Sequence, residues 1–236
     1  MAVYKRIIIK LSGEALTCEG AEGVYDKASI DRTAKAIADV VRAGVQVGIV
    51  CGGGNIWRGR FDRSMDAVTG DYMGMLATVI NALCLKDALT RAGVEARVQT
   101  AVEMRTVAEQ FVRDKAIQHL ENGRVVIFAG GTGNPHFTTD TAAALRASEI
   151  GADAILKGTT VDALYDSDPR KNPDAKPIYD ITYADCVAKE LHVMDITAFT
   201  ICREQQVPQI RVFSAADPEN LLRVVNGEKI GSTVHM

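Results

Sequence analysis

The sequence predicts an α/β fold in which helices cover both faces of a mostly parallel sheet, that is, a three-layer α/β/α sandwich. Along the whole chain, short apolar runs rich in Val and Ile alternate with segments that have helical spacing of apolar residues. The runs are nearly continuous, as expected for strands buried on both faces. With 236 residues, 47% hydrophobic and 24% charged, the chain is long enough for one large domain and short for two. We therefore expect a single domain spanning residues 1–236.

The first half of the chain alternates four predicted strands with three predicted helices. Ser29 is a candidate cap for the first helix, in which Ile30, Ala34 and Ile37 recur at helical spacing and which Gly44 ends. A long helix is expected to open at Gly70 and Asp71 and to close at Gly93. The third helix is predicted over residues 107–120. The strands are predicted over residues 4–11, 45–51, 94–98 and 124–128.

The second half continues the alternation around one polar insertion. Strands are predicted over residues 153–157, 209–213 and 232–235, the last at an edge. Helices are predicted over residues 141–150, 182–191 and 217–226, with another that begins at Asp195 as its cap. Residues 162–177 are polar and contain three of the six prolines, which is typical of an exposed loop or lid.

Composition and residue spacing exclude several classes of protein. The net charge of −3 provides no broad cationic surface, so nucleic acid is not an expected partner. We found no apolar run near the roughly 18 residues of a membrane span, and the start turns polar too soon for a signal peptide, so a cytoplasmic protein is expected. The five cysteines are far apart without a CxxC pair, and the four histidines are scattered. This spacing predicts reduced thiols and no metal site built from protein ligands.

Residues 129–141, AGGTGNPHFTTDT, form the segment with the clearest functional potential. They follow a predicted strand and precede a helix, where free backbone N–H groups and the helix dipole favour anions. Gly130, Gly131 and Gly133 allow the backbone to approach a ligand closely. A capped connection between strand and helix is an equally simple interpretation, since Gly, Asn, Pro and Thr are ordinary turn and cap residues.

Further candidate phosphate-binding groups lie at other predicted strand ends. Lys10 and Lys157 each end a strand and are followed by a hydroxyl residue and glycine. Arg58 follows the triple glycine of residues 52–54 and offers a planar fork for phosphate oxygens. Asp71 is either a helix cap or an acceptor for ligand hydroxyls. The chain has no GxSxG elbow and no GxxxxGK[ST] loop, so the set points to phosphoryl transfer without a P-loop.

Five motifs in this order and spacing resemble the bacterial uridylate kinases (UMP kinases) of the amino acid kinase superfamily. The motifs are KLSGE at 10–14, GGGNIWRG at 52–59, GDYMGMLATVINAL at 70–83, TGNPHFTTDT at 132–141 and MDITAF at 194–199. The resemblance spans residues 4 to about 231. It implies that UDP is made from UMP and ATP with Mg²⁺, on a three-layer α/β/α fold, by a homohexamer regulated by GTP activation and UTP inhibition.

The resemblance also implies roles for particular residues. The residues implied to contact ATP are Lys10, Leu11, Ser12, Gly13, Gly54, Arg58, Thr159, Tyr165 and Asp168. Those implied to hold UMP are Gly53, Asp71, Thr132, Gly133, Asn134, Pro135, His136, Phe137, Thr138 and Thr139. The residues implied to be needed for catalysis are Lys10, Lys157, Asp140 and Asp195. The family more often has Phe or Tyr in place of His136, and residues 17–23 match the region where the family's GTP effector acts.

The physical chemistry leaves open what Asp140 and Asp195 do. They could organise the lysines, help to place Mg²⁺ through water, or only fix the helix starts, and we favour the first role for both. Two other functions are considered. A kinase of a carboxylate such as acetylglutamate would not need the GGGNIWRG segment with Asp71, and a non-catalytic nucleotide sensor would not need the charged set of lysines and carboxylates.

Overall fold

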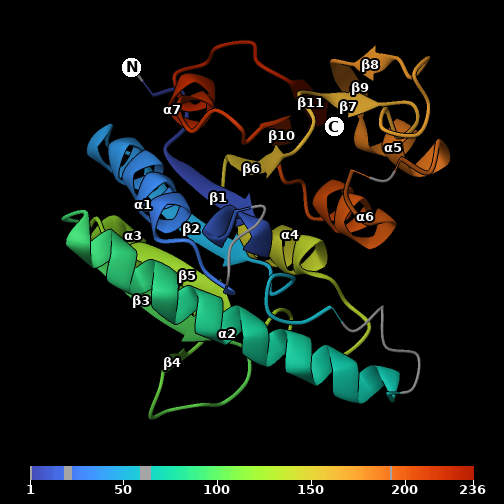
Figure 1. Cartoon of the computed structure of the whole chain (residues 1–236). Helices are drawn as coiled ribbons and strands as arrows, with labels where there is room; N and C mark the ends of the chain where they lie inside the picture. The colour runs from blue at the N-terminus through green and yellow to red at the C-terminus, as the bar shows by residue number, and fades with distance from the viewer. Residues whose placement is uncertain (1, 19–22, 59–64, 192) are drawn as a thin grey trace.

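A mostly parallel sheet forms the middle layer of the molecule, as predicted (Figure 1). The computed structural model describes residues 2–18, 23–58, 65–191 and 193–236. In these residues, nine strands lie in the order β4-β3-β5-β2-β1-β6-β10-β11-β9. Their bounds are β1 Arg6–Leu11, β2 Gln46–Cys51, β3 Ala96–Thr100, β4 Glu109–Gln110, β5 Val125–Ala129, β6 Ala154–Thr159, β9 Asp180–Thr182, β10 Gln209–Ser214 and β11 Ser232–His235. Only β10 and β11 pair in antiparallel fashion among these strands.

Helices cover both faces of this sheet, because the alternating side chains of each strand feed two separate cores. In β1, Ile7 and Ile9 belong to one core and Ile8 to the other, and all three are fully buried. The helices over the first core are α1 Lys27–Arg42, α2 Ala67–Arg91 and α7 Glu219–Val225. Those over the second are α3 Arg113–Glu121, α4 Thr139–Ile150, α5 Tyr183–Ala188 and α6 Ile196–Glu204. The three-layer α/β/α prediction is confirmed.

Two helices start earlier than the sequence predicted. Asp26, not Ser29, caps α1, since its carboxylate accepts a hydrogen bond of 2.7 Å from the backbone N–H of Ser29. Asp66 caps α2 and accepts from the backbone N–H of Thr69 at 2.9 Å. Asp71 therefore lies inside α2, and its interpretation as a cap is wrong. In both cases an aspartate upstream takes the role first given to a later residue of similar capping ability.

The prediction of a helix over residues 107–120 is wrong in its first half. Glu109 and Gln110 form β4, which pairs with Gln99 and Thr100 at the edge of β3, and the helix begins only at Arg113. The pairing with β3 overrides the local helical pattern. The two ends of the insertion at 162–177 pair with each other, as the antiparallel strands β7 Leu164–Tyr165 and β8 Pro177–Ile178. Strand β9 follows β8, and none of these three short strands was predicted.

Helix α2 is the longest helix, and one of its faces is exposed in the single chain. Tyr72, Leu76 and Ile80 are 48%, 44% and 49% exposed and recur every four residues, so they lie on one side of the helix. By length and composition α2 could span a membrane, but 44% of its most apolar window is buried. Since α2 packs on the sheet through Val79, Ala82 and Leu85, we interpret it as a core helix with an additional apolar face.

Candidate active site

A largely buried triad of two lysines and one aspartate lies at the carboxyl ends of the central strands. Lys10 on β1 and Lys157 on β6 are register partners in adjacent parallel strands. Asp140, in the first turn of α4, lies between them, with its two carboxylate oxygens 2.9 Å from Lys10 Nζ and 2.7 Å from Lys157 Nζ. Open α/β sheets bind ligands at this edge. The structure thus brings together three of the four residues that were expected to be catalytic.

The charges of this triad depend on one another. Burial raises the pKa of the Asp140 carboxyl, but the two lysines outweigh burial and hold this pKa below its ordinary value. Burial lowers the pKa of Lys157 to about 8, against the opposing effect of Asp140. Lys157 also donates a hydrogen bond to the carbonyl of Val193. The triad carries a net positive charge when both lysines are protonated, as a phosphate site requires.

Asp195, the fourth expected catalytic residue, has the contacts of a helix cap. Its carboxylate accepts from the backbone N–H of Ala198 at 2.6 Å, which confirms the predicted cap of α6. It also accepts from the hydroxyls of Thr138 and Thr141 at the start of α4. Asp195 therefore joins the starts of α4 and α6, and it acts on Lys157 only as a nearby charge that opposes the lowering of its pKa.

The glycine loop that follows β2 packs against its neighbours more tightly than any other residue type would allow. A Cβ on Gly13 would lie 2.3 Å from Asn55 Oδ1, and a Cβ on Gly53 would lie 2.8 Å from the Cβ of Ala77. These glycines bring the loops after β1 and β2 together beside α2. At least part of the glycine content therefore serves close packing between protein segments.

Two buried polar residues of α2, which the sequence reading passed over as part of an apolar stripe, fix the loops of the site. The amide of Asn81 donates to the carbonyl of Gly52 and to Asn55 Oδ1, both at 2.7 Å. The hydroxyl of Thr78 accepts from the backbone N–H of Gly130 at 2.8 Å. Both residues are at most 4% exposed. A polar side chain repeated among apolar residues on a helix was the signal that could have revealed them.

Arg58 lies at the open side of the same loop, where it is half exposed. Its Nε donates to the carbonyl of Gly54 at 2.8 Å, and its guanidinium pairs with Glu14. Arg58 and Gly54 are thus brought together, as expected for residues with a common ligand. Glu14 therefore competes with a phosphate group for Arg58.

The segment from Gly130 to Thr139 forms a second loop that closes on α2. Gly130, Gly131, Gly133 and His136 have φ values of 75°, 58°, 81° and 70°, a region that favours glycine. The strained His136 is held through its backbone N–H, which donates to Asp71 Oδ2 at 2.7 Å. Asp71 thus faces the loop expected to hold UMP, although one of its oxygens is already engaged.

The remaining residues of this loop reach from solvent to the helix start. The imidazole of His136 and the ring of Phe137 are largely exposed, and Thr132 and Asn134 hydrogen bond to each other. Thr138 caps α4 by accepting from the N–H of Asp140 at 3.0 Å. Helix α4 begins at Thr139, two residues earlier than predicted. Pro135 lies between these groups in the chain, so eight of the ten expected UMP residues belong to one continuous segment, residues 132–139.

The polar insertion carries the other residues expected to contact ATP. Tyr165 donates to Asp162 at 2.8 Å and Asp168 pairs with Arg170, so both side chains have partners within the insertion. Asp168, and more weakly Glu14, raise the pKa of Arg170. The structure does not bring Tyr165 or Asp168 into contact with the lysines.

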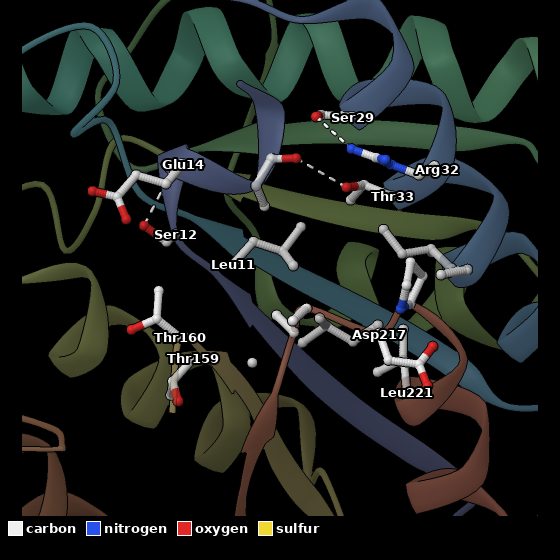
Figure 2. A pocket seen from close by; sticks show the side chains of 18 of the residues that line it. Leu11, Ser12, Glu14, Ser29, Arg32, Thr33, Thr159, Thr160, Asp217 and Leu221 are labelled. Atoms are coloured by element: carbon white, nitrogen blue, oxygen red, sulfur yellow. Dashed lines mark hydrogen bonds between the residues drawn. The ribbon is translucent and has the colours of Figure 1, made fainter. Parts of the chain in front are cut away.

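A cavity of about 470 Å³ opens next to this site, on the side of α1 and α7 (Figure 2). Leu11, Ser12 and Thr159 line it, and Figure 2 shows Asp217 and Leu221 on the opposite wall. Its walls are mostly apolar. The expected ATP residues at the ends of β1 and β6 therefore border a space able to hold part of a ligand.

The side chains provide no ready cage for a metal ion. In the described residues, no group of three or more His, Cys, Asp or Glu side chains is placed to hold one. Asp140 is engaged by two lysines and Asp195 by two threonines. Mg²⁺ is usually held in proteins through one or two carboxylates together with substrate phosphates, so it does not require such a cage.

Comparison with known proteins identifies the class to which this fold and site belong. The model of the amino acid kinase family matches residues 5–214, and the chain therefore belongs to that family. Within it, the chain is similar to the UMP kinase from Bacillus anthracis, with 38% identity, a TM-score of 0.93 and coverage of 98% of this chain and 96% of that one. The UMP kinase from Ureaplasma parvum is 36% identical, with a TM-score of 0.91 and coverage of 98% and 99%.

A more distant likeness extends the same relationship. The uridylate kinase from Archaeoglobus fulgidus is 26% identical, with a TM-score of 0.75 and coverage of 99% of this chain and 100% of that one. These likenesses confirm the resemblance to the uridylate kinases that the five motifs indicated.

Proposed function

We propose that this chain is a UMP kinase, which transfers the γ-phosphoryl group of ATP to UMP and yields UDP for pyrimidine nucleotide biosynthesis. The observation that carries the proposal is the pair of largely buried lysines held by Asp140 at the sheet edge, in a chain similar to UMP kinases over nearly its full length. The whole of residues 1–236 acts as one catalytic domain in this proposal.

The two lysines supply the charge that phosphoryl transfer requires. Charge spreads over the oxygens of the transferred group in the transition state, and cations fixed in advance lower its energy. Lys10 and Lys157 project from adjacent rigid strands, and Asp140 keeps both ammonium groups in place. Asp195 is a positioning residue, because it ties the start of α4, and hence Asp140, to α6.

In this proposal the loop after β1 binds ATP, and the loop after β5 binds UMP. The loop after β1, with Gly54 and Arg58 beside it, provides ATP contacts, and Thr159, Tyr165 and Asp168 extend them toward the base and ribose. The segment from Thr132 to Thr139 holds UMP, with the start of α4 as the phosphate site and Asp71 near the ribose. Mg²⁺ would neutralise phosphate charge when bound, and Asp140 and Asp195 are the carboxylates that would hold it through water.

Assembly, regulation and location follow the same family expectation. The exposed face of α2 is a candidate contact surface for a homohexamer. GTP activation, through the region of residues 17–23, and UTP inhibition are proposed on the resemblance alone; residues 19–22 lie outside the described residues. A cytoplasmic location agrees with the five cysteines, all of which are free.

A coupled assay of ADP formation tests the proposal with ATP, Mg²⁺ and a panel of acceptors. We expect turnover with UMP and none with N-acetylglutamate. A protein that binds both nucleotides without turnover would instead be a nucleotide sensor.

A further inference from the structure

A second cavity, of about 670 Å³, lies away from the lysine triad, next to the start of the chain and the loop between α7 and β11. Arg211 of β10 lines it, together with Tyr4, Tyr179, Lys229 and Thr233. The proposed kinase reaction uses none of these residues.

Arg211 is a buried cation without an anionic partner. It is only 8% exposed, and no salt bridge joins it to a carboxylate in the described part of the chain. Its Nη2 donates to the carbonyls of Ile230 and Glu228 at 3.0 Å and 3.3 Å, and its Nη1 has one long contact of 3.5 Å with the Tyr4 hydroxyl. Nε has no hydrogen-bond partner among the described residues.

Nε is itself shielded, but the four N–H groups of Nη1 and Nη2 make only three contacts, one of them long, so the guanidinium has donor capacity left. A buried charge that lacks a counter-charge is costly, and an oxyanion in the cavity would offset this cost. Lys229 adds a second, exposed cation at the wall, and it forms no ion pair with the residues that the structure describes. Asp180 is the acidic residue that lines this cavity, and its carboxylate already pairs with His235 at 3.0 Å.

We propose that this cavity binds a small oxyanion, a phosphate or carboxylate group, through Arg211 and Lys229. The site is separate from the nucleotide sites, and it holds the loop between α7 and β11 against β10 when occupied. Lys229 is exposed, and its side chain makes no hydrogen bond or ion pair with the described residues, so it is the residue to change first.

Thermal unfolding in inorganic phosphate, against sodium chloride of equal ionic strength, tests the site. Bound ligand raises the unfolding temperature by mass action. We expect the phosphate dependence of Lys229→Ala to correspond to an affinity about two- to fivefold weaker than that of wild type. Lys189→Ala, which removes an exposed lysine outside the cavity, is the matched control and should behave as wild type. General stabilisation by phosphate acts equally on all three proteins.

Lys10→Ala separates this site from the active site. If phosphate still raises the unfolding temperature of Lys10→Ala as in wild type, but raises that of Lys229→Ala less, the new site is supported. This conclusion does not depend on the outcome for UMP kinase activity. Equal phosphate dependence in Lys229→Ala and Lys189→Ala would overturn it, and so would an effect abolished by Lys10→Ala alone. Acetate in place of phosphate shows whether the site also takes carboxylates. Arg211→Lys, if it folds, should weaken the effect further because it removes the planar fork.

Discussion

At the scale of single residues, the proposed mechanism of phosphoryl transfer depends most on Lys10. Lys10→Ala should lower kcat by about 10²- to 10³-fold, because it removes a fixed cation that faces developing phosphoryl charge. Lys157 remains to pair with Asp140, so the fold should persist by circular dichroism. Steady-state kinetics measure the effect, with Lys189→Ala as control. Near-normal turnover in Lys10→Ala would contradict the assigned role.

Lys157 should make the reaction sensitive to alkaline pH. Its pKa in the folded protein is lowered from 10.5 to about 8, so its charge is lost as pH rises through 8. The kcat/KM for ATP should therefore fall above pH 8, since this parameter reports the free enzyme. In Lys157→Arg the fall should disappear, because a guanidinium stays charged. A wild-type profile that is flat up to pH 9.5 would refute this interpretation.

The lowered pKa of Lys157 also affects stability, and here its effect with rising pH is favourable, whereas its effect on activity is unfavourable. Between pH 8 and 10.5 the unfolded chain binds more protons at Lys157 than the folded chain does. The contribution of this group to the free energy of unfolding therefore rises with pH across that window. Activity and the Lys157 contribution to stability should thus change in opposite directions, which thermal unfolding at matched pH values can show.

At the scale of elements, the contact between α2 and the loop after β5 should control ribose recognition. Asp71 faces that loop and binds the N–H of His136 through one oxygen. A ribose hydroxyl that donates to Asp71 would be missing in dUMP, so dUMP should react about tenfold to a hundredfold less efficiently than UMP. Asp71→Asn keeps the shape and should narrow this gap in kcat/KM. Equal efficiency of UMP and dUMP in the wild type would remove the role of Asp71 only.

The type of each helix or strand was easier to predict from sequence than its first residue or the polar contacts that hold the neighbouring loops. The apolar runs and helical spacing predicted the central strands and most helices, because burial on two faces leaves a strong pattern. Helix starts failed at Ser29 and Asp71 because several capping residues stand close together. The short β4 and β9 depend on pairing with distant strands, and Asn81 and Thr78 depend on loops that only the fold brings to α2.

The candidate site also combines residues that sequence could predict with contacts that only the fold reveals. Lys10 and Lys157 were predictable as residues of one sheet edge, but the placement of Asp140 between them requires knowledge of the α4 position. The competition of Glu14 for Arg58 and the engagement of Asp71 by His136 also depend on segments distant in the chain. Sequence thus indicated candidate groups for the chemistry, and tertiary contacts decide how these groups are held.

At the scale of the whole molecule, the exposed face of α2 should bury itself between subunits. Ile80→Glu places a charge in the middle of this apolar face, and a charge left unpaired in an interface is strongly destabilising. We expect light scattering to show a hexamer for wild type and smaller species for Ile80→Glu at micromolar concentration. Lys86→Glu, an exposed position on the same helix, is the control. A stable wild-type monomer would contradict this prediction.

The most direct test of the central claim is the initial rate of phosphoryl transfer to UMP, compared with CMP and N-acetylglutamate, at saturating ATP and Mg²⁺. The lysine triad and the likeness to UMP kinases predict rapid formation of UDP, a much slower reaction with CMP, and none with the carboxylate. Phosphorylation of N-acetylglutamate without phosphorylation of UMP would contradict the account at its root.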